Sequence, residues 1–177
     1  MIKNIILNDL QIRNKIKRIS LQITEDNINE NEIVIVGVEP KGFKLAEEIV
    51  KNIKEISKIN LILCKIKIDK KKPFEELSIS IDKETLKNKS VVVIDDVLNS
   101  GSTLIYSVKF LLNIELKKLK TAVLINRSHT KFPITANFNG LSLSTSLQNH
   151  IEVKFEENSI NAYLCLLYTS DAADETG

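Results

Sequence analysis

Short apolar runs recur along the chain, and each is followed by a stretch with a different periodicity. The runs are rich in Ile and Val, and an unbroken apolar run of this length is typical of a strand that is buried on both faces. We therefore expect buried strands at each of these runs. They cover residues 33–38, 60–68, 91–94 and 119–126.

The intervening stretches have apolar residues every three or four positions, as on one face of a helix. In the first, Ile12, Ile16, Ile19 and Ile23 form one stripe, and Asp9 is the expected N-cap. The alternation of strands and helices predicts an α/β fold, a mostly parallel twisted sheet with helices on both faces. The expected helices cover residues 9–25, 43–56 and 103–113.

Two smaller β elements are expected beside this sheet. After the charged, proline-containing segment 69–76, residues 78–84 are expected to continue as a short strand, in a small β hood in lid position over one end of the sheet. Residues 151–155 and 160–164 flank a polar turn and predict a C-terminal hairpin.

The most informative stretch is residues 91–103, where two adjacent carboxylates close a buried strand. Asp95 and Asp96 are followed by the hydroxyl-rich loop Asn99-Ser100-Gly101-Ser102-Thr103, which leads into a helix. Adjacent carboxylates repel each other unless a cation or several hydrogen-bond donors lie between them, and Mg²⁺ or the hydroxyls of a ribose would serve. Backbone N–H groups at the start of a helix favour a phosphate. The spacing therefore predicts a site for a ribose 5-phosphate.

Two further loops are expected near this site. The loop at residues 37–42 contains Lys41 and joins a strand to a helix, although such a Gly-x-x-x-x-Gly loop is also compatible with a simple tight turn. Arg127 and His129 follow the strand at residues 119–126, and a structural role is the alternative for this histidine. Ligands of open α/β sheets bind at the carboxyl ends of the strands, so the three loops are expected to meet there.

Composition adds little to this picture. The 177 residues are 43% hydrophobic with a formal net charge of +2, which suits one globular domain and argues neither for nor against nucleic acid. No apolar run is long enough to span a bilayer, and the first residues lack a leader-type apolar segment, so we expect a cytoplasmic protein with no membrane partner. Cys64 lies in an apolar run and is expected to be a buried free thiol.

The last residues differ in composition from the rest. The bias towards Lys, Ile and Asn ends abruptly, and CLLYTSDAADE resembles the translation of a sequencing adapter. We therefore expect a domain over residues 1–164 and a non-native tail over residues 165–177. A genuine short C-terminal segment is the alternative.

Residues 92–103 resemble the phosphoribosyl pyrophosphate (PRPP) signature of the type I phosphoribosyltransferases, in which an apolar strand, two acids and a hydroxyl–Gly–x–Thr loop follow one another. GVEPKGFKLAEEI resembles the pyrophosphate loop of that family. INRSHTKFPI is similar to the Arg-x-His-x-x-x-Pro-Ile region of the pyrimidine-operon regulator and uracil phosphoribosyltransferase proteins, the PyrR group.

The resemblance implies a glycosyltransferase of pyrimidine salvage that moves the 5-phosphoribosyl group of PRPP to a nucleobase and releases pyrophosphate. It implies Mg²⁺ as cofactor, a homodimer or higher homo-oligomer, and a lid formed by the loop at residues 69–80. It assigns catalysis to Asp95, Asp96 and Lys41, Mg²⁺ to Asp95 and Asp96 directly or through water, and PRPP to these two acids with Asn99, Ser100, Gly101, Ser102 and Thr103. Pyrophosphate is assigned to Pro40, Lys41 and Gly42, and the base to Arg127 and His129.

Departures from the family pattern bear on the substrate. Asn99 replaces an aspartate that handles a purine ring proton in the hypoxanthine-type enzymes, which favours a pyrimidine such as uracil. Pro40-Lys41-Gly42 replaces Thr-Arg-Gly, which argues against the RNA binding of the PyrR group. Ser102 replaces an arginine of that group. Three readings stay open: an active transferase, an RNA-binding regulator of pyrimidine genes, and an inactive PRPP or nucleotide sensor.

Overall fold

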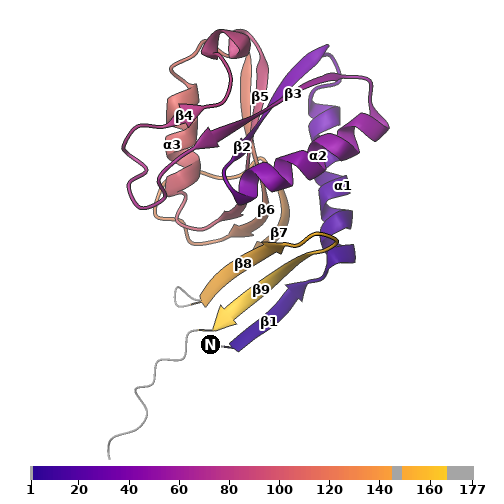
Figure 1. Ribbon diagram of the computed structural model, residues 1–177, viewed down its shortest axis with the longest axis vertical. Helices are drawn as coiled ribbons and strands as arrows, with labels where there is room; N and C mark the ends of the chain where they lie inside the picture. Colours follow the sequence, from indigo (N-terminus) through magenta and orange to yellow (C-terminus); the bar gives the residue numbers. More distant parts are fainter. Residues whose placement is uncertain (1, 145–148, 167–177) are drawn as a thin grey trace, which may run out of the picture.

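A computed structural model describes residues 2–144 and 149–166 of the chain, which form a six-stranded main sheet and a separate three-stranded sheet (Figure 1). The main sheet is parallel except at one edge, where β4 runs antiparallel to β3. In spatial order its strands are β4 (Ser78–Ile79), β3 (Asn60–Lys67), β2 (Glu32–Val38), β5 (Ser90–Leu98), β6 (Lys118–Arg127) and β7 (Phe138–Leu143).

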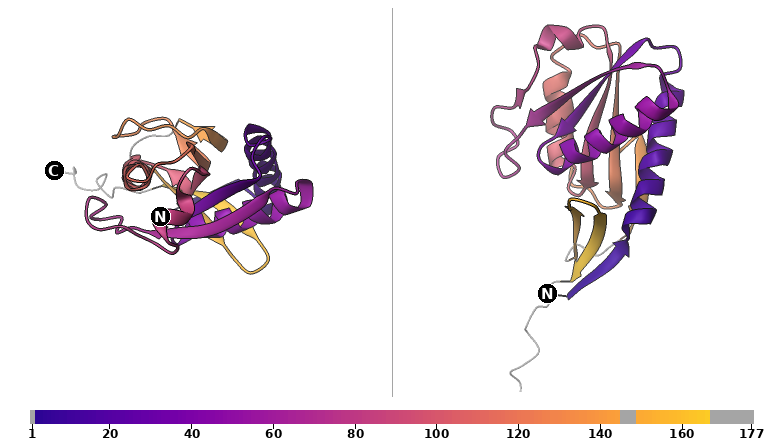
Figure 2. Two further views of the ribbon diagram at one scale, coloured as in Figure 1. Left: turned by 90° about the horizontal axis from the view of Figure 1, so that it is seen from above. Right: turned by 45° about the vertical axis from the view of Figure 1, so that its right-hand side comes forward.

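Helices cover both faces of the main sheet. Figure 2 shows α1 (Asp9–Asp26) and α2 (Lys41–Ile56) on one side of it and α3 (Ser102–Leu111) on the other. On β2, Ile33 and Ile35 pack in the core beneath α1 and α2, while Val34 and Val36 pack in the core beneath α3. Burial of both faces explains the unbroken apolar runs, and the predicted α/β class is confirmed.

A three-stranded antiparallel sheet lies beyond the carboxyl ends of β5 and β6 (Figure 1). From here on, the name hood refers to this sheet and not to the small β element expected at residues 78–84. The expected hairpin supplies two of its strands, β8 (Asn149–Phe155) and β9 (Ile160–Leu166). The third, β1 (Ile2–Leu7), was not expected from the sequence and pairs with β9. The predicted excursion at residues 78–84 instead forms only the two-residue β4, followed by the 3₁₀ helix η1 (Lys83–Leu86).

The N-cap of α1 is Asn8, so the expectation of Asp9 was wrong by one residue. The Asn8 side chain accepts a hydrogen bond from the backbone N–H of Gln11, and the Gln11 side chain accepts one from the backbone N–H of Asn8. Asp9 accepts instead from the backbone N–H of Ile160, at 2.8 Å, and so ties the start of α1 to the hood.

The expected domain boundary falls inside β9. Cys165 is buried, and Cys165 and Leu166 pair with Lys3 and Ile2 of β1. The remaining positions of the expected tail, residues 167–177, lie outside the described residues, so its non-native origin stays a prediction. Within residues 2–144 and 149–166, no helix is both long and apolar enough to cross a membrane.

Candidate functional site

A pocket of about 470 Å³ opens at the carboxyl ends of the parallel strands. The chain passes from β2 outwards to β3 and then returns to β5 on the other side of β2, so the strand order reverses between β2 and β5. Such a reversal leaves a crevice beyond the strand ends where ligands bind. The pocket is lined by the segment after β2, the loop after β3, the end of β5 with the loop that follows it, and the hood strand β8.

The acid pair lies inside β5 and not at its end, which corrects the expectation from sequence. The strand continues through Val97 and Leu98, both of which pair with β6. Its pairing with β2 ends at Ile94, and beyond that point β5 has no partner on the β2 side within the described residues. Asp95 and Asp96 therefore both reach the pocket although they belong to a strand.

Both carboxylates are nearly shielded from solvent, with Asp95 3% and Asp96 7% exposed. An oxygen of Asp95 accepts a hydrogen bond from the backbone N–H of Asp96, at 2.9 Å. Burial raises the pKa of Asp95 well above its ordinary value, the charge of Asp96 raises it further, and the charge of Lys70 opposes both. The protein therefore neutralises the negative charge of the pair only in part, and the pair favours a ligand that brings positive charge or hydrogen-bond donors.

This donor set fits Mg²⁺, which binds through one or two carboxylates together with substrate phosphates and water. Among the described residues, no three His, Cys, Asp or Glu side chains gather to hold a metal by themselves. A metal at Asp95 and Asp96 would thus need further oxygens from a bound ligand or from water.

The hydroxyl-rich loop is built around Gly101, whose φ of +86° is a left-handed conformation that disfavours side chains. The backbone N–H groups of Lys131 and Phe132 both donate to the carbonyl oxygen of Ser100, at 2.8 and 3.0 Å, and hold the loop in place. Asn99, Ser100, Gly101 and Thr103 line the pocket at the start of α3.

Ser102 does not line the pocket. Its backbone N–H donates to the hydroxyl oxygen of Ser100, at 3.2 Å, so Ser102 shapes the loop from within.

The expected pyrophosphate loop lies beside the acid pair. Pro40, which follows a cis peptide bond, and Lys41 line the pocket where α2 begins. Gly42 lies behind the acid pair, and a Cβ added to it would come within 2.9 Å of the Asp95 Cα. A side chain at this position would therefore displace Asp95.

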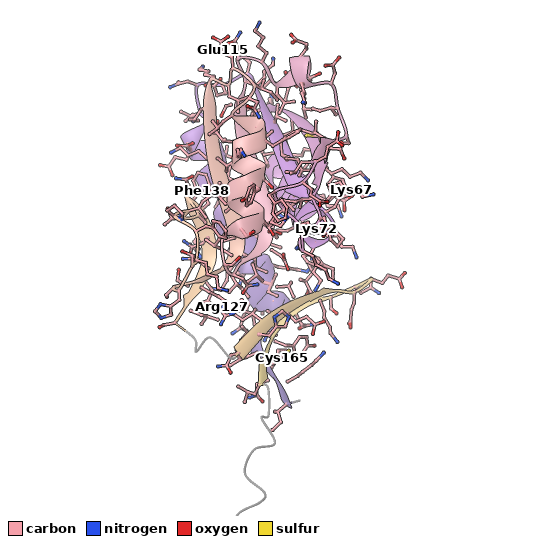
Figure 3. All side chains as sticks on the ribbon, turned by 90° about the vertical axis from the view of Figure 1, so that its left-hand side faces the viewer. Lys67, Lys72, Glu115, Arg127, Phe138 and Cys165 are labelled. Atoms are coloured by element: carbon pink, nitrogen blue, oxygen red, sulfur yellow. The ribbon has the colours of Figure 1, made fainter. Side chains whose placement is uncertain are left out.

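Arg127 and His129, the expected base contacts, do not line the pocket. Arg127 lies at the end of the main sheet nearest the hood, far from Glu115 at the opposite end (Figure 3). Its guanidinium donates a hydrogen bond to the side-chain oxygen of Asn99, at 3.1 Å, and Asn99 does line the pocket. Direct base contacts by Arg127 and His129 stay a prediction.

Two polar residues of the pocket were not expected from the sequence. Lys70 belongs to the expected lid loop, and the run of lysines there was a signal that one of them faces an anion. His150 reaches the pocket from β8 beside Ile151. No local pattern marks His150, because its place depends on how the hood sits over the main sheet.

Comparisons with known proteins agree with this geometry. The family described as phosphoribosyl transferase domain matches residues 4–159. A protein named bifunctional protein PyrR from Fusobacterium nucleatum is 35% identical over 86% of this chain and 91% of its own. The protein of the same name from Clostridium kluyveri is 30% identical over 92% of this chain and 98% of its own.

Solved structures agree on the fold. A hypoxanthine-guanine phosphoribosyltransferase from Bacillus anthracis has a TM-score of 0.67 and 25% identity, over 80% of this chain and 84% of its own. The hypoxanthine phosphoribosyltransferase of Trypanosoma cruzi has a TM-score of 0.72 at 15% identity, over 90% of this chain and 95% of its own. This chain belongs to the phosphoribosyltransferase domain family, and the PyrR proteins are among its relatives.

Proposed function

We propose that this protein transfers the 5-phosphoribosyl group of PRPP to uracil or another pyrimidine base and releases pyrophosphate. One observation carries the proposal: the acid pair, the hydroxyl-rich loop and Lys41 line one pocket in a chain of the phosphoribosyltransferase family. Each part matches one part of PRPP. Asp95 and Asp96 would bind the ribose hydroxyls, Ser100, Gly101 and Thr103 the 5-phosphate, and Pro40 and Lys41 the pyrophosphate.

In the proposed reaction, the bond from ribose C1 to the pyrophosphate oxygen breaks and a bond from C1 to a base nitrogen forms. The proton that this nitrogen loses is taken up by the departing pyrophosphate. Negative charge grows on the departing pyrophosphate, and the cations of Lys41 and Lys70 would stabilise it in the pocket. Mg²⁺ held at the acid pair would supply further positive charge to the phosphate oxygens. The hood would exclude water, which otherwise competes with the base.

The choice of a pyrimidine rests on Asn99. An amide has no basic site that could take a proton from a purine ring, and an enzyme for hypoxanthine or guanine would lose that assistance. A base that needs no such proton transfer at this point is compatible with Asn99.

The test is pyrophosphate release from PRPP and Mg²⁺ with a panel of uracil, cytosine, hypoxanthine, guanine and adenine. Release with uracil above the purines is expected, and Asp96→Asn should abolish it while the chain stays folded. If no base supports release but PRPP still raises the melting temperature, the protein is a PRPP sensor and the transferase proposal is wrong.

A second candidate is RNA-dependent regulation, which is favoured by the 30–35% identity to proteins named bifunctional protein PyrR. Lys41 stands where that group has an arginine, and lysine is the weaker bidentate anion ligand. A gel-shift assay with pyrimidine-operon leader RNA tests this candidate. Absence of a shift even at low salt would exclude it, because phosphate contacts are strongest there.

A further inference from the structure

We infer that Arg127 acts on the nucleobase through Asn99: its guanidinium holds the oxygen of the Asn99 amide and leaves the NH₂ group to donate to a carbonyl oxygen or unprotonated ring nitrogen of the base. The inference rests on the proposed function and deepens it, because it names the feature of the base that the site selects. Arg127 is thereby a positioning residue, and Asn99 is the residue that contacts the ligand.

The backbone places these two residues side by side. Leu98 at the end of β5 pairs with Asn126 of β6, so Asn99 and Arg127 are the next residues along two parallel neighbouring strands. Arg127 is still part of β6, and its other side pairs with Leu143 of β7. The hydrogen bond of 3.1 Å between Arg127 Nη1 and Asn99 Oδ1 therefore joins the last residue of β6 to the first residue after β5.

The chemistry of the pair fixes which way the amide faces. A guanidinium has five N–H donors and no acceptor, so only the oxygen of the Asn99 amide can bind it. The NH₂ group, with two donors, is then left for other partners. Asn99 lines the pocket and Arg127 does not, so the donor is presented where a ligand would lie.

This orientation has a consequence for substrate choice. Asn99 is exposed in the ligand-free protein, so a bound base would itself cover the amide. A base that presents an acceptor to Asn99 gains a hydrogen bond, whereas a base that presents N–H there places two donors against each other and displaces the water that had bound them. An aspartate at the same position would also bind Arg127 but would offer the ligand only acceptors. The pair thus favours oxo-substituted bases that need no proton removed at this point.

The experiment compares two ligands by titration calorimetry with the full chain and Mg²⁺. Uridine 5′-monophosphate carries the base and ribose 5-phosphate lacks it, so the ratio of their Kd values isolates the base. We expect uridine 5′-monophosphate to bind about tenfold more tightly in the unaltered protein. Asn99→Ala and Asn99→Asp should each reduce that ratio by about fivefold to tenfold, with ribose 5-phosphate affinity unchanged.

Arg127 is tested by two substitutions. In Arg127→Gln the new amide can present either oxygen or nitrogen to Asn99, so the orientation is no longer fixed and the ratio should fall as in Asn99→Ala. Arg127→Lys keeps a side chain with donors only and should restore most of the ratio. In the double variant Asn99→Ala/Arg127→Gln, the second change should have no further effect, because Arg127 acts through Asn99.

Lys131→Gln serves as the matched control, because it removes the same charge from the segment that follows β6, and the ratio should not move. A melting curve for each variant separates loss of binding from loss of fold. The inference would be overturned if the two substitutions had additive effects on the Kd ratio in the double variant. It would also be overturned if Arg127→Gln lowered the affinity for both ligands equally. Binding of ribose 5-phosphate without any gain from the base would overturn the inference alone, whereas failure of ribose 5-phosphate to bind would overturn the proposed function with it.

Discussion

Gly42 lies so close to Asp95 that a Cβ on Gly42 would come within 2.9 Å of the Asp95 Cα and 3.0 Å of its carboxylate oxygen. The same Cβ would lie 2.6 Å from the carbonyl oxygen of Ile94. The first turn of α2 thus serves as a support for the acid pair. Because the two nearest atoms belong to the backbone, a side chain at position 42 would have to displace the backbone of β5.

We expect Gly42→Ala to lower the free energy of unfolding by about 1–3 kcal/mol and to weaken ribose 5-phosphate binding. Gly140→Ala is the matched control, since its Cβ would lie equally close to a carbonyl oxygen, 2.6 Å from that of Leu124, away from the pocket. Both variants should melt at lower temperature, but only Gly42→Ala should bind ligand less tightly when folded. Equal affinities in calorimetry would contradict a supporting role for Gly42.

Asp95→Asn should stabilise the ligand-free protein at neutral pH while it removes PRPP binding. Because burial and the charge of Asp96 raise the pKa of Asp95 in the folded state, its contribution to stability is fully present below its unfolded pKa of about 3.9 and is lost as pH rises through the folded pKa. Asparagine avoids that loss and can still accept from the backbone N–H of residue 96. We expect a gain of about 0.5–2 kcal/mol at pH 7.

The pH dependence provides the control for this prediction. Urea unfolding measures the free energy of unfolding of Asp95→Asn and of the unaltered protein. The difference between the two values should shrink towards zero as the pH is lowered past the unfolded pKa of about 3.9. A gain in stability that persists undiminished in acid would mean that the carboxylate charge is not its cause.

Lys70→Gln should weaken PRPP binding about threefold to tenfold, because it removes a cation that faces the acid pair and the pocket. Lys72→Gln changes the same loop by the same chemistry, but Lys72 does not line the pocket and pairs with Glu75 at 3.5 Å. Figure 3 labels Lys72 on this loop. Titration of PRPP at two salt concentrations should give a smaller salt dependence for Lys70→Gln than for Lys72→Gln; identical behaviour would place Lys70 outside the site.

The two histidines allow a direct comparison of sequence and structure. The sequence favoured His129 as a base contact, whereas the structure places His150 in the pocket. We expect His150→Asn to raise the KM for the base more than His129→Asn does. The affinity for PRPP is the control and should change little in either variant. The opposite order would favour the assignment made from sequence.

The sequence predicted the main sheet well because each strand buries both faces. Val92 and Ile94 pack beneath α1 and α2 while Val91 and Val93 pack beneath α3, so no polar position interrupts the run. The end of β5 could not be predicted from the same pattern. A carboxylate normally ends such a run, but here β6 continues to pair with β5 beyond Asp95, after β2 has ended.

The hood was predicted only in part, because one of its two strand pairings joins segments that are far apart in the sequence. The hairpin of β8 and β9 is local, and its turn is visible in the sequence. The partner of β1 lies at the other end of the described chain, and most of β1 is exposed, so its residues carry no clear pattern. His150 could not be placed in the pocket before the hood itself was known.

The central position of β9 in the hood also bears on the order of folding. Leu7 pairs with Ala162 across nearly the whole chain, whereas the strands of the main sheet pair over much shorter separations. Contacts between distant segments form late because the chain must first lose the entropy of a long loop. The acid pair and the hydroxyl-rich loop would then be assembled before the hood closes over them. A ligand that touches both would join the part of the molecule that forms first to the part that forms last, and so would slow the opening of the hood.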